Sequence, residues 1–422
     1  MKMTCEERGT PPAISDSMLQ GAVLHEAQSR SNEKNCRRKH YCLQSPPAIV
    51  IGACAHGLAL IHALSNAGVP VISLDTNPAL PGTRTRFSCV ELIPDINGPA
   101  LLDALLDLHA RIEAPDKPVL FLNNDRMVRT LGVHWHRLAD KFHLSWSACS
   151  NTLLPLLEKD SLELRCQQAG LLYPETCLIH NDMDARTAVT TIGFPMIIKP
   201  VRPLGGFKTF LPTNADELLR WTEIHQPDLP FMAQRFIPGD DRAIYFSALY
   251  LDAGKVLARF DGHKLRSRPL GHTTIAESFR NEEVYRQTLN FFDGLNLSGP
   301  VSLEVKKAPD DSYWVIEPTV GRTDFWVGLC IANGINLPYV EYRHQTGQSI
   351  PDLAQQDQAI WFNEESDPFG RFWFAGQADL ALKGRRACYL YLKQKDAEPA
   401  KLALKKIGMQ LGRAAAKRLG FR

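Results

Sequence analysis

The residues best suited to chemistry are a lysine at the end of an apolar run and the glycine-rich turn that follows it. Residues 193–200 read Gly-Phe-Pro-Met-Ile-Ile-Lys-Pro, and Gly205, Gly206 and Lys208 come soon after Lys199. Glycines let backbone N–H groups approach phosphate oxygens, and lysines neutralise the phosphate charge. The pattern favours a nucleotide triphosphate, although an ordinary strand and turn with solvated lysines explains this segment equally well.

Two glutamates form the second feature with chemical potential. Glu304 lies in an apolar run at 299–306, Glu317 lies in another at 313–319, and a turn at 308–312 predicts that the runs pair as a hairpin. Carboxylates on paired strands can meet on one face, and glutamates are rarely buried without a partner. A shared Mg²⁺ whose octahedron is completed by triphosphate oxygens explains them. Two separate surface salt bridges are the alternative.

Two segments between these features suit the same ligand. Residues 231–241 form an extended apolar stretch that ends in glycine and carboxylates, which fits a purine held by backbone groups and a ribose held by a carboxylate. Residues 259–274 are dense in cations, including Arg266, Arg268 and His272. Their donors suit a carboxylate and its acyl phosphate, while an exposed basic loop is the other interpretation.

The elements that must position these residues begin with an α/β unit. Residues 48–75 predict a strand, a glycine turn, a helix and a second strand, and a helix at 99–112 and a strand at 118–122 continue the alternation. We therefore expect a doubly wound sheet. The polar cluster Asn123–Arg126 follows the last strand, where such sheets bind ligands, but a helix cap at Asp125 explains it equally well.

The glycines Gly52 and Gly57 of this unit invite a dinucleotide interpretation. Their spacing is not G-x-G-x-x-G, so we interpret the unit as a scaffold. A nicotinamide or flavin oxidoreductase would also leave Lys199, Glu304 and Glu317 without a role.

Composition limits the classes of protein to consider. The chain has 422 residues, 44% of them hydrophobic and 22% charged, which is typical of a soluble protein with two or three domains. The ten cysteines are scattered without a C-x-x-C pair, so we expect reduced thiols in a cytoplasmic protein. Residues 393–422 carry a net charge of +7 within a total of +2. The remainder is therefore mildly acidic, which argues against nucleic acid as a partner.

Taken in order, these features resemble the ATP-grasp superfamily, and in particular its uncharacterised carboxylate–amine ligase-like proteins. The resemblance covers roughly residues 46–348 and ends in Ile-Glu-Pro-Thr-Val-Gly-Arg at 316–322. It implies an α/β protein, α+β in the nucleotide-binding part, with a Rossmann-like pre-ATP-grasp domain followed by a two-lobed ATP-grasp fold.

The domains expected from this resemblance and from the chain are four. Residues 1–45 form a flexible extension, 46–150 the pre-ATP-grasp domain, 151–350 the ATP-grasp domain with its hinge near 234–241, and 351–422 a C-terminal extension with a basic tail. A helix at 152–169 opens the ATP-grasp domain. Beyond about residue 355 the pattern is less regular, and we expect its clustered aromatic residues to pack against the body.

The resemblance also implies roles for individual residues. The nucleotide phosphates would be contacted by Lys159 and Lys199 and covered by a flap containing Gly205, Gly206 and Lys208. The adenine slot would be lined by Gln234, Phe236 and Ile237, with the ribose on Asp241. The magnesium would be held by Glu304, Glu317 and Thr319. The acid substrate and its acyl phosphate would be contacted by Arg266, Arg268, His272 and Arg322.

The implied activity is an ATP- and Mg²⁺-dependent ligase that joins a small carboxylate to an amine or similar nucleophile through an acyl phosphate. Thr319 stands where the superfamily usually has asparagine, and Arg322 lies one residue later than the usual arginine. The alternative is therefore a catalytically weak nucleotide-binding or regulatory ATP-grasp protein.

The basic tail allows a last expectation. Leu404, Ile407, Leu411 and Ala415 recur at helical spacing among lysines and arginines, as in helices that lie on anionic membranes. Gly408 and Gly412 each cost about 1 kcal/mol of helix stability relative to alanine, so we favour a stripe that docks on the protein or a disordered tail.

We predict that the protein does not co-sediment with anionic vesicles at physiological salt, because the stripe is interrupted by these glycines. Sedimentation at low and physiological salt checks this. Salt-sensitive binding that disappears when residues 393–422 are deleted would contradict it.

Overall fold

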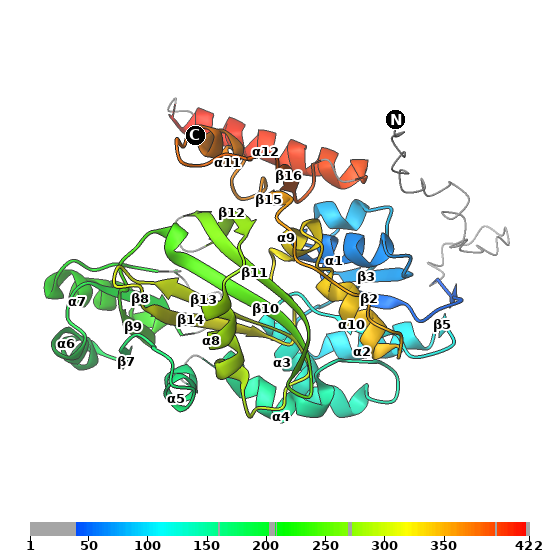
Figure 1. The fold of residues 1–422 in the computed structure, drawn as a ribbon, viewed down its shortest axis with the longest axis horizontal. Coiled ribbons are helices and arrows are strands. Elements are labelled where there is room, and N and C mark those ends of the chain that lie inside the picture. Colours follow the sequence, from blue (N-terminus) through cyan, green and yellow to red (C-terminus); the bar gives the residue numbers. More distant parts are fainter. Residues whose placement is uncertain are drawn as a thin grey trace, which may run out of the picture.

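The protein, seen here as a computed structural model, is an α/β molecule in which the described residues form four sheets (Figure 1). The structure describes residues 39–158, 161–201, 207, 209–268, 272–392 and 395–418, and for 272, 410, 411 and 413–418 only the backbone. The fold class predicted from the sequence is confirmed.

The first sheet is parallel and has the order β4-β3-β2-β6. Its strands are β2 (Ala48–Ile51), β3 (Val71–Asp75), β4 (Cys89–Leu92) and β6 (Val119–Phe121), and its helices are α1 (Ala55–Ser65), α2 (Ala100–His109) and α3 (Asp125–His134). All residues of β2 and β3 are buried, as expected for parallel strands covered on both faces. This is the alternating unit that the sequence predicts.

Residues 39–45 correct the predicted extent of the flexible N-terminal extension. Here β1 (Tyr41–Cys42) pairs with β5 (Ile112–Glu113). Tyr41 is 2% exposed and its hydroxyl donates to Glu91 Oε1 at 2.6 Å. Burial of this aromatic ring and its hydrogen bond stabilise the segment against the parallel sheet. Residues 1–38 lie outside the described part of the chain.

The glycines after β2 serve the packing of the turn itself. Gly52 has a φ of +92°, and Asn123 Nδ2 donates to its carbonyl oxygen at 2.9 Å. A Cβ at Gly57 would lie 1.8 Å from the Gly52 carbonyl oxygen. Ala53 N donates to Asp75 Oδ2 at 2.6 Å. The turn is therefore packed on its own sheet edge, which supports the interpretation of this unit as a scaffold.

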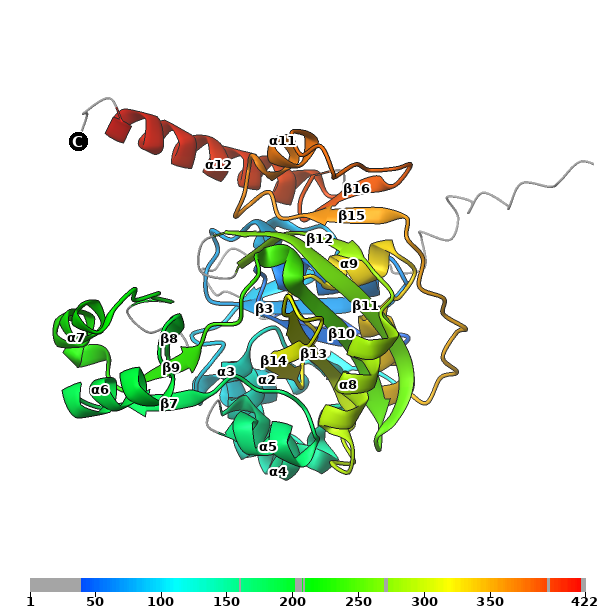
Figure 2. The ribbon, with the colours of Figure 1, turned by 60° about the vertical axis from the view of Figure 1, so that its left-hand side comes forward.

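A small antiparallel sheet of order β7-β9-β8 lies to one side of the molecule (Figure 2). It consists of β7 (Thr176–Ile179), β8 (Met196–Pro200) and β9 (Phe231–Arg235), and α6 (Asp182–Thr191) and α7 (Ala215–Ile224) belong to the same unit. These elements share a hydrophobic cluster that includes Ala185, Ile198, Leu218 and Phe231. The strand predicted around Lys199 is confirmed as β8.

The long helix predicted at 152–169 is wrong. Its place is taken by α4 (Ser150–Leu153), a 3₁₀ turn (Leu154–Leu157) and α5 (Leu162–Gln168). Pro155 lies at the start of the 3₁₀ turn. Proline has no N–H and clashes with the preceding helical turn, so an α-helix cannot run through this position without a kink or break.

The largest sheet has seven strands in the order β14-β13-β10-β11-β12-β15-β16. The strands are β10 (Ile244–Asp252), β11 (Lys255–Arg268), β12 (His272–Ser278), β13 (Gly299–Lys307), β14 (Tyr313–Val320), β15 (Ala359–Phe362) and β16 (Arg386–Tyr389). Three of its helices are α8 (Glu282–Phe292), α9 (Val327–Ala332) and α10 (Leu337–Gln345). Because β15 and β16 come from the C-terminal extension, that extension completes the sheet.

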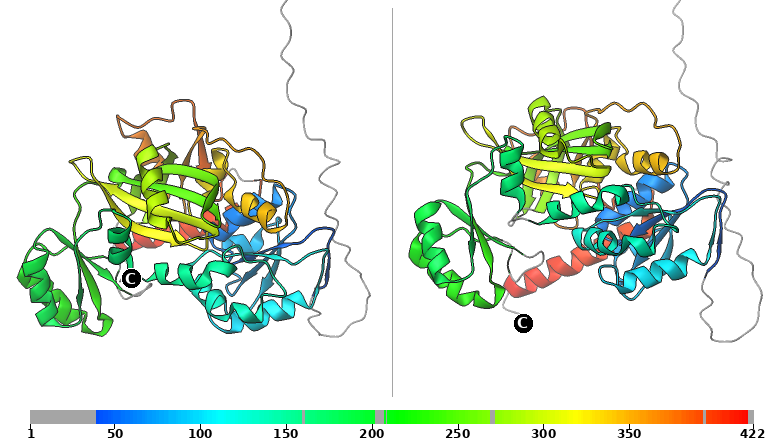
Figure 3. Two further views of the ribbon diagram at one scale, coloured as in Figure 1. Left: turned by 60° about the horizontal axis from the view of Figure 1, so that its bottom comes forward. Right: turned by 90° about the horizontal axis from the view of Figure 1, so that it is seen from below.

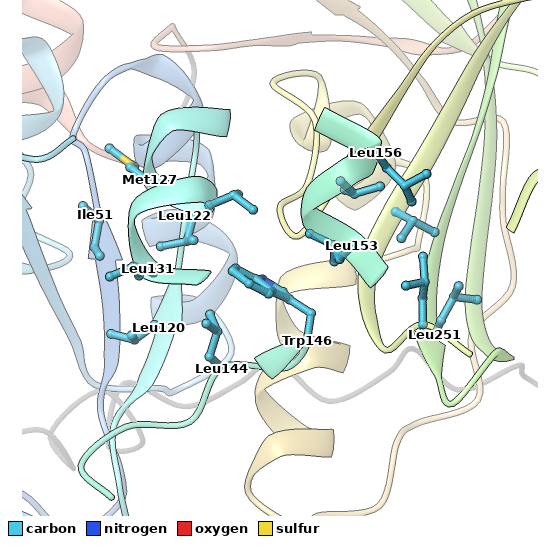
Figure 4. Packing of buried hydrophobic residues seen from close by; sticks show 14 of the residues in the cluster. Ile51, Leu120, Leu122, Met127, Leu131, Leu144, Trp146, Leu153, Leu156 and Leu251 are labelled. Atoms are coloured by element: carbon cyan, nitrogen blue, oxygen red, sulfur yellow. The ribbon is translucent and has the colours of Figure 1, made fainter. Parts of the chain in front are cut away.

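Trp146 joins the parallel sheet to the large sheet. It is 0% exposed and belongs to a core that contains Ile51 and Leu120 from one side and Leu251 and Leu303 from the other. Figure 4 shows Trp146 between Leu120 and Leu144 on one side and Leu153 on the other. The two sheets therefore share one continuous core, and Figure 3 shows the small sheet lying apart from it.

The C-terminal helix α12 (Ala397–Arg418) contacts the 3₁₀ turn Pro81–Arg84, which follows β3 of the parallel sheet. Asp396, 2% exposed, lies just before it and pairs with His62 Nε2 at 3.0 Å and with the Thr85 hydroxyl. Ala403 is buried and Leu404 is 50% exposed, so α12 docks through its first turns (Figure 2). None of the helices searched among the described residues is long and apolar enough to cross a membrane.

Glu341 of α10 is a buried carboxyl inside this shared core. It is 4% exposed, and the Ser145 hydroxyl donates to its Oε1 at 2.6 Å. Burial raises the pKa of the Glu341 carboxyl to about 8. The folded protein therefore binds a proton that the unfolded chain releases above its ordinary pKa, so this group lowers stability as pH rises towards 8.

We predict that Glu341→Gln raises the melting temperature at pH 9 and changes it little at pH 5, because the amide stays neutral at both. The gain at pH 9 should be on the order of 2 kcal/mol. Thermal unfolding at both pH values checks it. Glu223→Gln, an exposed position on α7, is the control, and an equal shift at the two pH values would contradict the explanation.

Candidate active site

The two predicted carboxylates face each other on the β13–β14 hairpin. Glu304 is paired with Glu317, and Ser302 with Thr319. Alternate residues of a strand share a face, so all four side chains lie on one face of the large sheet. Glu304 is 6% exposed, Thr319 is 7% exposed and Glu317 is exposed. The predicted hairpin is confirmed, and so is the position of its two glutamates opposite each other.

Lys264 of β11 is the partner of Glu304, and sequence reasoning did not nominate it. Its Nζ donates to Glu304 Oε2 at 2.7 Å, and both residues are buried. Burial lowers the pKa of the Lys264 ammonium, but the charges of Glu304 and its neighbouring carboxylates outweigh burial and raise it. Burial raises the pKa of Glu304 to about 7, with Lys264 opposing that rise. The one sequence feature that points to Lys264 is its position among the cations of residues 259–274.

The hydroxyl of Thr319 donates to Asp324 Oδ2 at 3.0 Å, and Ser302 Oγ lies 3.5 Å from the same oxygen. A hydroxyl that donates in this way keeps its lone pairs, so Thr319 can still offer an oxygen to a cation. Asp324 was not predicted, and no sequence motif marks it.

A magnesium ion fits this donor set, since carboxylate and hydroxyl oxygens are the ligands that it prefers. Glu304, Glu317 and Thr319 would hold it. Across the part of the chain that the structure describes, no group of three or more His, Cys, Asp or Glu side chains is placed to bind a metal alone. Because Mg²⁺ usually keeps several waters and binds substrate phosphates, phosphate oxygens and water would supply its other ligands.

Arg322 links the hairpin to the parallel sheet. Its Nε donates to Asp125 Oδ1 at 2.6 Å. Burial lowers the pKa of the Arg322 guanidinium, but the charges of Asp125 and Asp324 raise it overall. The N-cap of α3 is Asn124, whose side chain accepts from Met127 N at 2.9 Å. Asp125 is therefore not the cap, and it faces the candidate site.

His56 at the start of α1 completes this side of the site. Its Nε2 lies 3.0 Å from the Thr323 hydroxyl and its Nδ1 3.3 Å from the Asn123 carbonyl oxygen. Burial and the neighbouring Arg322 charge lower the pKa of His56 to about 3. The ring is therefore neutral and contributes hydrogen bonds, not charge.

The predicted phosphate lysine lies in the small sheet. Lys199 Nζ donates to Gln234 Oε1 at 2.8 Å, and Gln234 Nε2 donates to Thr176 Oγ1 at 3.0 Å. Gln234 is 3% exposed, so its amide orients Lys199 from inside the sheet. The predicted residues that lie outside the described part of the chain are Lys159, Gly205, Gly206 and Lys208, together with the side chain of His272.

The segment after β9, predicted to hold adenine and ribose, contacts the large sheet. The Lys306 ammonium lies 4.6 Å from the Phe236 ring centroid, and Lys306 is two residues beyond Glu304 on β13. Ile237 is 8% exposed. Asp241 Oδ2 accepts from Ser267 N at 2.7 Å. The predicted adenine segment therefore lies beside the strand that carries Glu304.

The cation-rich stretch at 259–274 is not an exposed loop, so that interpretation is wrong for its described residues. Most of it is β11, within the large sheet. Arg266 Nε donates to Asp367 Oδ2 at 2.7 Å, and its guanidinium lies 4.3 Å from the Trp373 ring centroid. Arg268 is exposed at the end of β11. The C-terminal extension thus supplies the partner of Arg266.

Solved structures of known proteins share this arrangement of sheets. An ATP complex of carboxyaminoimidazole ribonucleotide synthase from Aspergillus clavatus matches with a TM-score of 0.59, over 75% of this chain and 80% of that chain, at 13% identity. The chain has the ATP-grasp fold. The predicted resemblance is therefore confirmed at the level of fold.

Five curated proteins match in sequence, two of which are described here, and no protein-family model matches. The carbamoyl phosphate synthase large chain of Micrococcus luteus is 29% identical over 201 residues, which are 44% of this chain and 18% of that protein. The chain thus spans a small part of that relative's length. The D-alanine–D-alanine ligase of Pseudomonas putida is 21% identical over 284 residues, 64% of this chain and 79% of that protein.

We predict that Lys199→Met lowers ATP affinity at least tenfold, about 1.4 kcal/mol, because methionine keeps the length of the side chain and removes its charge. Calorimetric titration with ATP and Mg²⁺ checks it. Lys405→Met, at an exposed position of α12, should leave affinity unchanged. Equal ATP affinity in the wild type and Lys199→Met would remove Lys199 from the phosphate site.

Proposed function

We propose that the protein is an ATP-dependent ligase that joins a small carboxylate to an amine or similar nucleophile through an acyl phosphate. The observation that carries this proposal is the pairing of Glu304 with Glu317 beside two cations, the buried Lys264 and the partly buried Arg322, in a chain with the ATP-grasp fold. A site with these charges suits a nucleotide triphosphate and a metal.

The nucleotide would span from the segment after β9 to the β13–β14 hairpin. The contact of Phe236 with Lys306 supports this path, because it brings the predicted adenine segment next to the strand of Glu304. Magnesium on Glu304, Glu317 and Thr319 would neutralise phosphate charge. Lys199, oriented by Gln234, would contact the phosphates from the small sheet.

In the proposed reaction, a carboxylate oxygen of the acid attacks the γ-phosphorus of ATP, and ADP leaves. The amine nitrogen then attacks the acyl carbon, phosphate leaves, and the nitrogen loses a proton. Arg322 would orient the acid by charge, with Asp125 fixing the guanidinium. Such chemistry needs positioning and charge stabilisation, and no covalent nucleophile of the protein takes part.

The second candidate function is a nucleotide-binding regulatory protein with weak catalysis. It is favoured by one observation: Thr319 stands where the superfamily usually has asparagine, and a hydroxyl oxygen is a weaker metal ligand than an amide oxygen. ADP release across a panel of amino acids, amino sugars and small carboxylates separates the two functions. Nucleotide binding without ADP release from any pair of substrates would favour the regulatory function.

We predict that Glu317→Gln abolishes ADP release while the melting temperature stays within a few degrees of the wild type, because this carboxylate is exposed and its loss leaves no buried charge unpaired. Coupled ADP detection and thermal unfolding check this. Normal turnover would make the two carboxylates structural. Thr319→Asn is the complementary variant, and it should raise the affinity for Mg²⁺ if asparagine is the better ligand.

A further inference from the structure

The Glu304 carboxylate is divided between two tasks. Its Oε2 accepts from Lys264 Nζ at 2.7 Å, and the side chains of the pair are only 9% and 5% exposed, in that order. If Lys264 released Glu304, both charges would stay buried and unpaired, so separating the pair costs free energy. The ammonium 2.7 Å from Oε2 repels a cation at that oxygen, so Oε1 is the oxygen left to a cation in the candidate metal site.

The sheet holds Lys264 in place. Phe246 of β10 is in register with Gly262 of β11 on one side and with Glu304 of β13 on the other. Lys264 lies two residues after Gly262 and therefore on the same face of the sheet. A Cβ at Gly262 would lie 2.1 Å from the Phe246 ring, and that ring stacks on Trp326 at 3.8 Å. The lysine reaches Glu304 across this packed middle strand, so it has little freedom to move aside.

A carboxylate that offers one oxygen and a carboxylate that offers two suit different cations. Mg²⁺ has near-ideal octahedral geometry at about 2.0–2.1 Å and few carboxylate ligands, whereas Ca²⁺ takes about six to eight oxygens at 2.3–2.6 Å and readily uses a bidentate carboxylate. A glutamate that offers only Oε1 therefore suits Mg²⁺ and binds Ca²⁺ less favourably.

We propose that Lys264 is a positioning residue that restricts Glu304 to one metal-binding oxygen and so makes the nucleotide site select Mg²⁺ over Ca²⁺. This inference rests on the proposed function, because it requires a metal–nucleotide complex at Glu304 and Glu317. It adds a determinant of metal choice on a strand that carries none of the predicted metal ligands.

The test is the affinity for a non-hydrolysable ATP analogue, AMP-PNP, measured by calorimetry at saturating Mg²⁺ and at saturating Ca²⁺. The wild type should bind more tightly with Mg²⁺. In Lys264→Met the preference, given by the ratio of the two dissociation constants, should fall at least threefold because Oε2 becomes available. Lys255→Met, at the exposed start of the same strand, should keep the wild-type ratio.

A merely structural role would weaken binding equally with both metals and leave the ratio unchanged, which would overturn the proposal. Lys264→Gln, which keeps a polar group in the buried position, provides the same comparison if Lys264→Met does not fold. If the wild type binds AMP-PNP with neither metal, the proposed function and this inference are both overturned. Binding with an unchanged ratio would overturn the inference alone.

Discussion

The packing of Trp146 between the parallel sheet and the large sheet is the contact on which the candidate site depends. Its Nε1 donates to the Gly321 carbonyl oxygen at 2.8 Å. A Cβ at Gly321 would lie 3.0 Å from the same nitrogen, and one at Gly299 would lie 3.2 Å from the Trp146 Cβ. Both glycines have positive φ, so they meet a steric and a conformational requirement. This contact fixes the end of β14, and therefore the position from which Arg322 reaches Asp125.

The second constraint is electrostatic. Burying a pair such as Lys264 and Glu304 costs desolvation free energy that the attraction between them only partly offsets, and apolar residues of similar size would stabilise the fold at least as well. The arrangement is therefore poorly explained by stability alone. It is better explained by a ligand that carries charge of its own, since a water-poor environment strengthens its interactions with fixed charges.

The features that could be predicted from the sequence are those with local signals. The β13–β14 hairpin follows from two apolar runs and one turn, and β8 follows from an apolar run that ends in Lys199. Lys264 could not be singled out, because its partner lies two strands away. The Asp125 side chain fits a cap and a site equally well until Asn124 is seen to accept from Met127 N. The partner of Arg266 is 101 residues away along the chain, and no local pattern announces such a pair.

The contribution of the C-terminal extension to the large sheet has a consequence for biosynthesis. Until β15 is made, β12 is an edge strand whose unpaired backbone groups can pair with another chain. The partner of Arg266 leaves the ribosome about a hundred residues after Arg266 itself, and so does the strand that covers this edge. The nascent chain therefore carries an open sheet edge while residues 279–358 are being made, which is the interval in which a chaperone has most to protect.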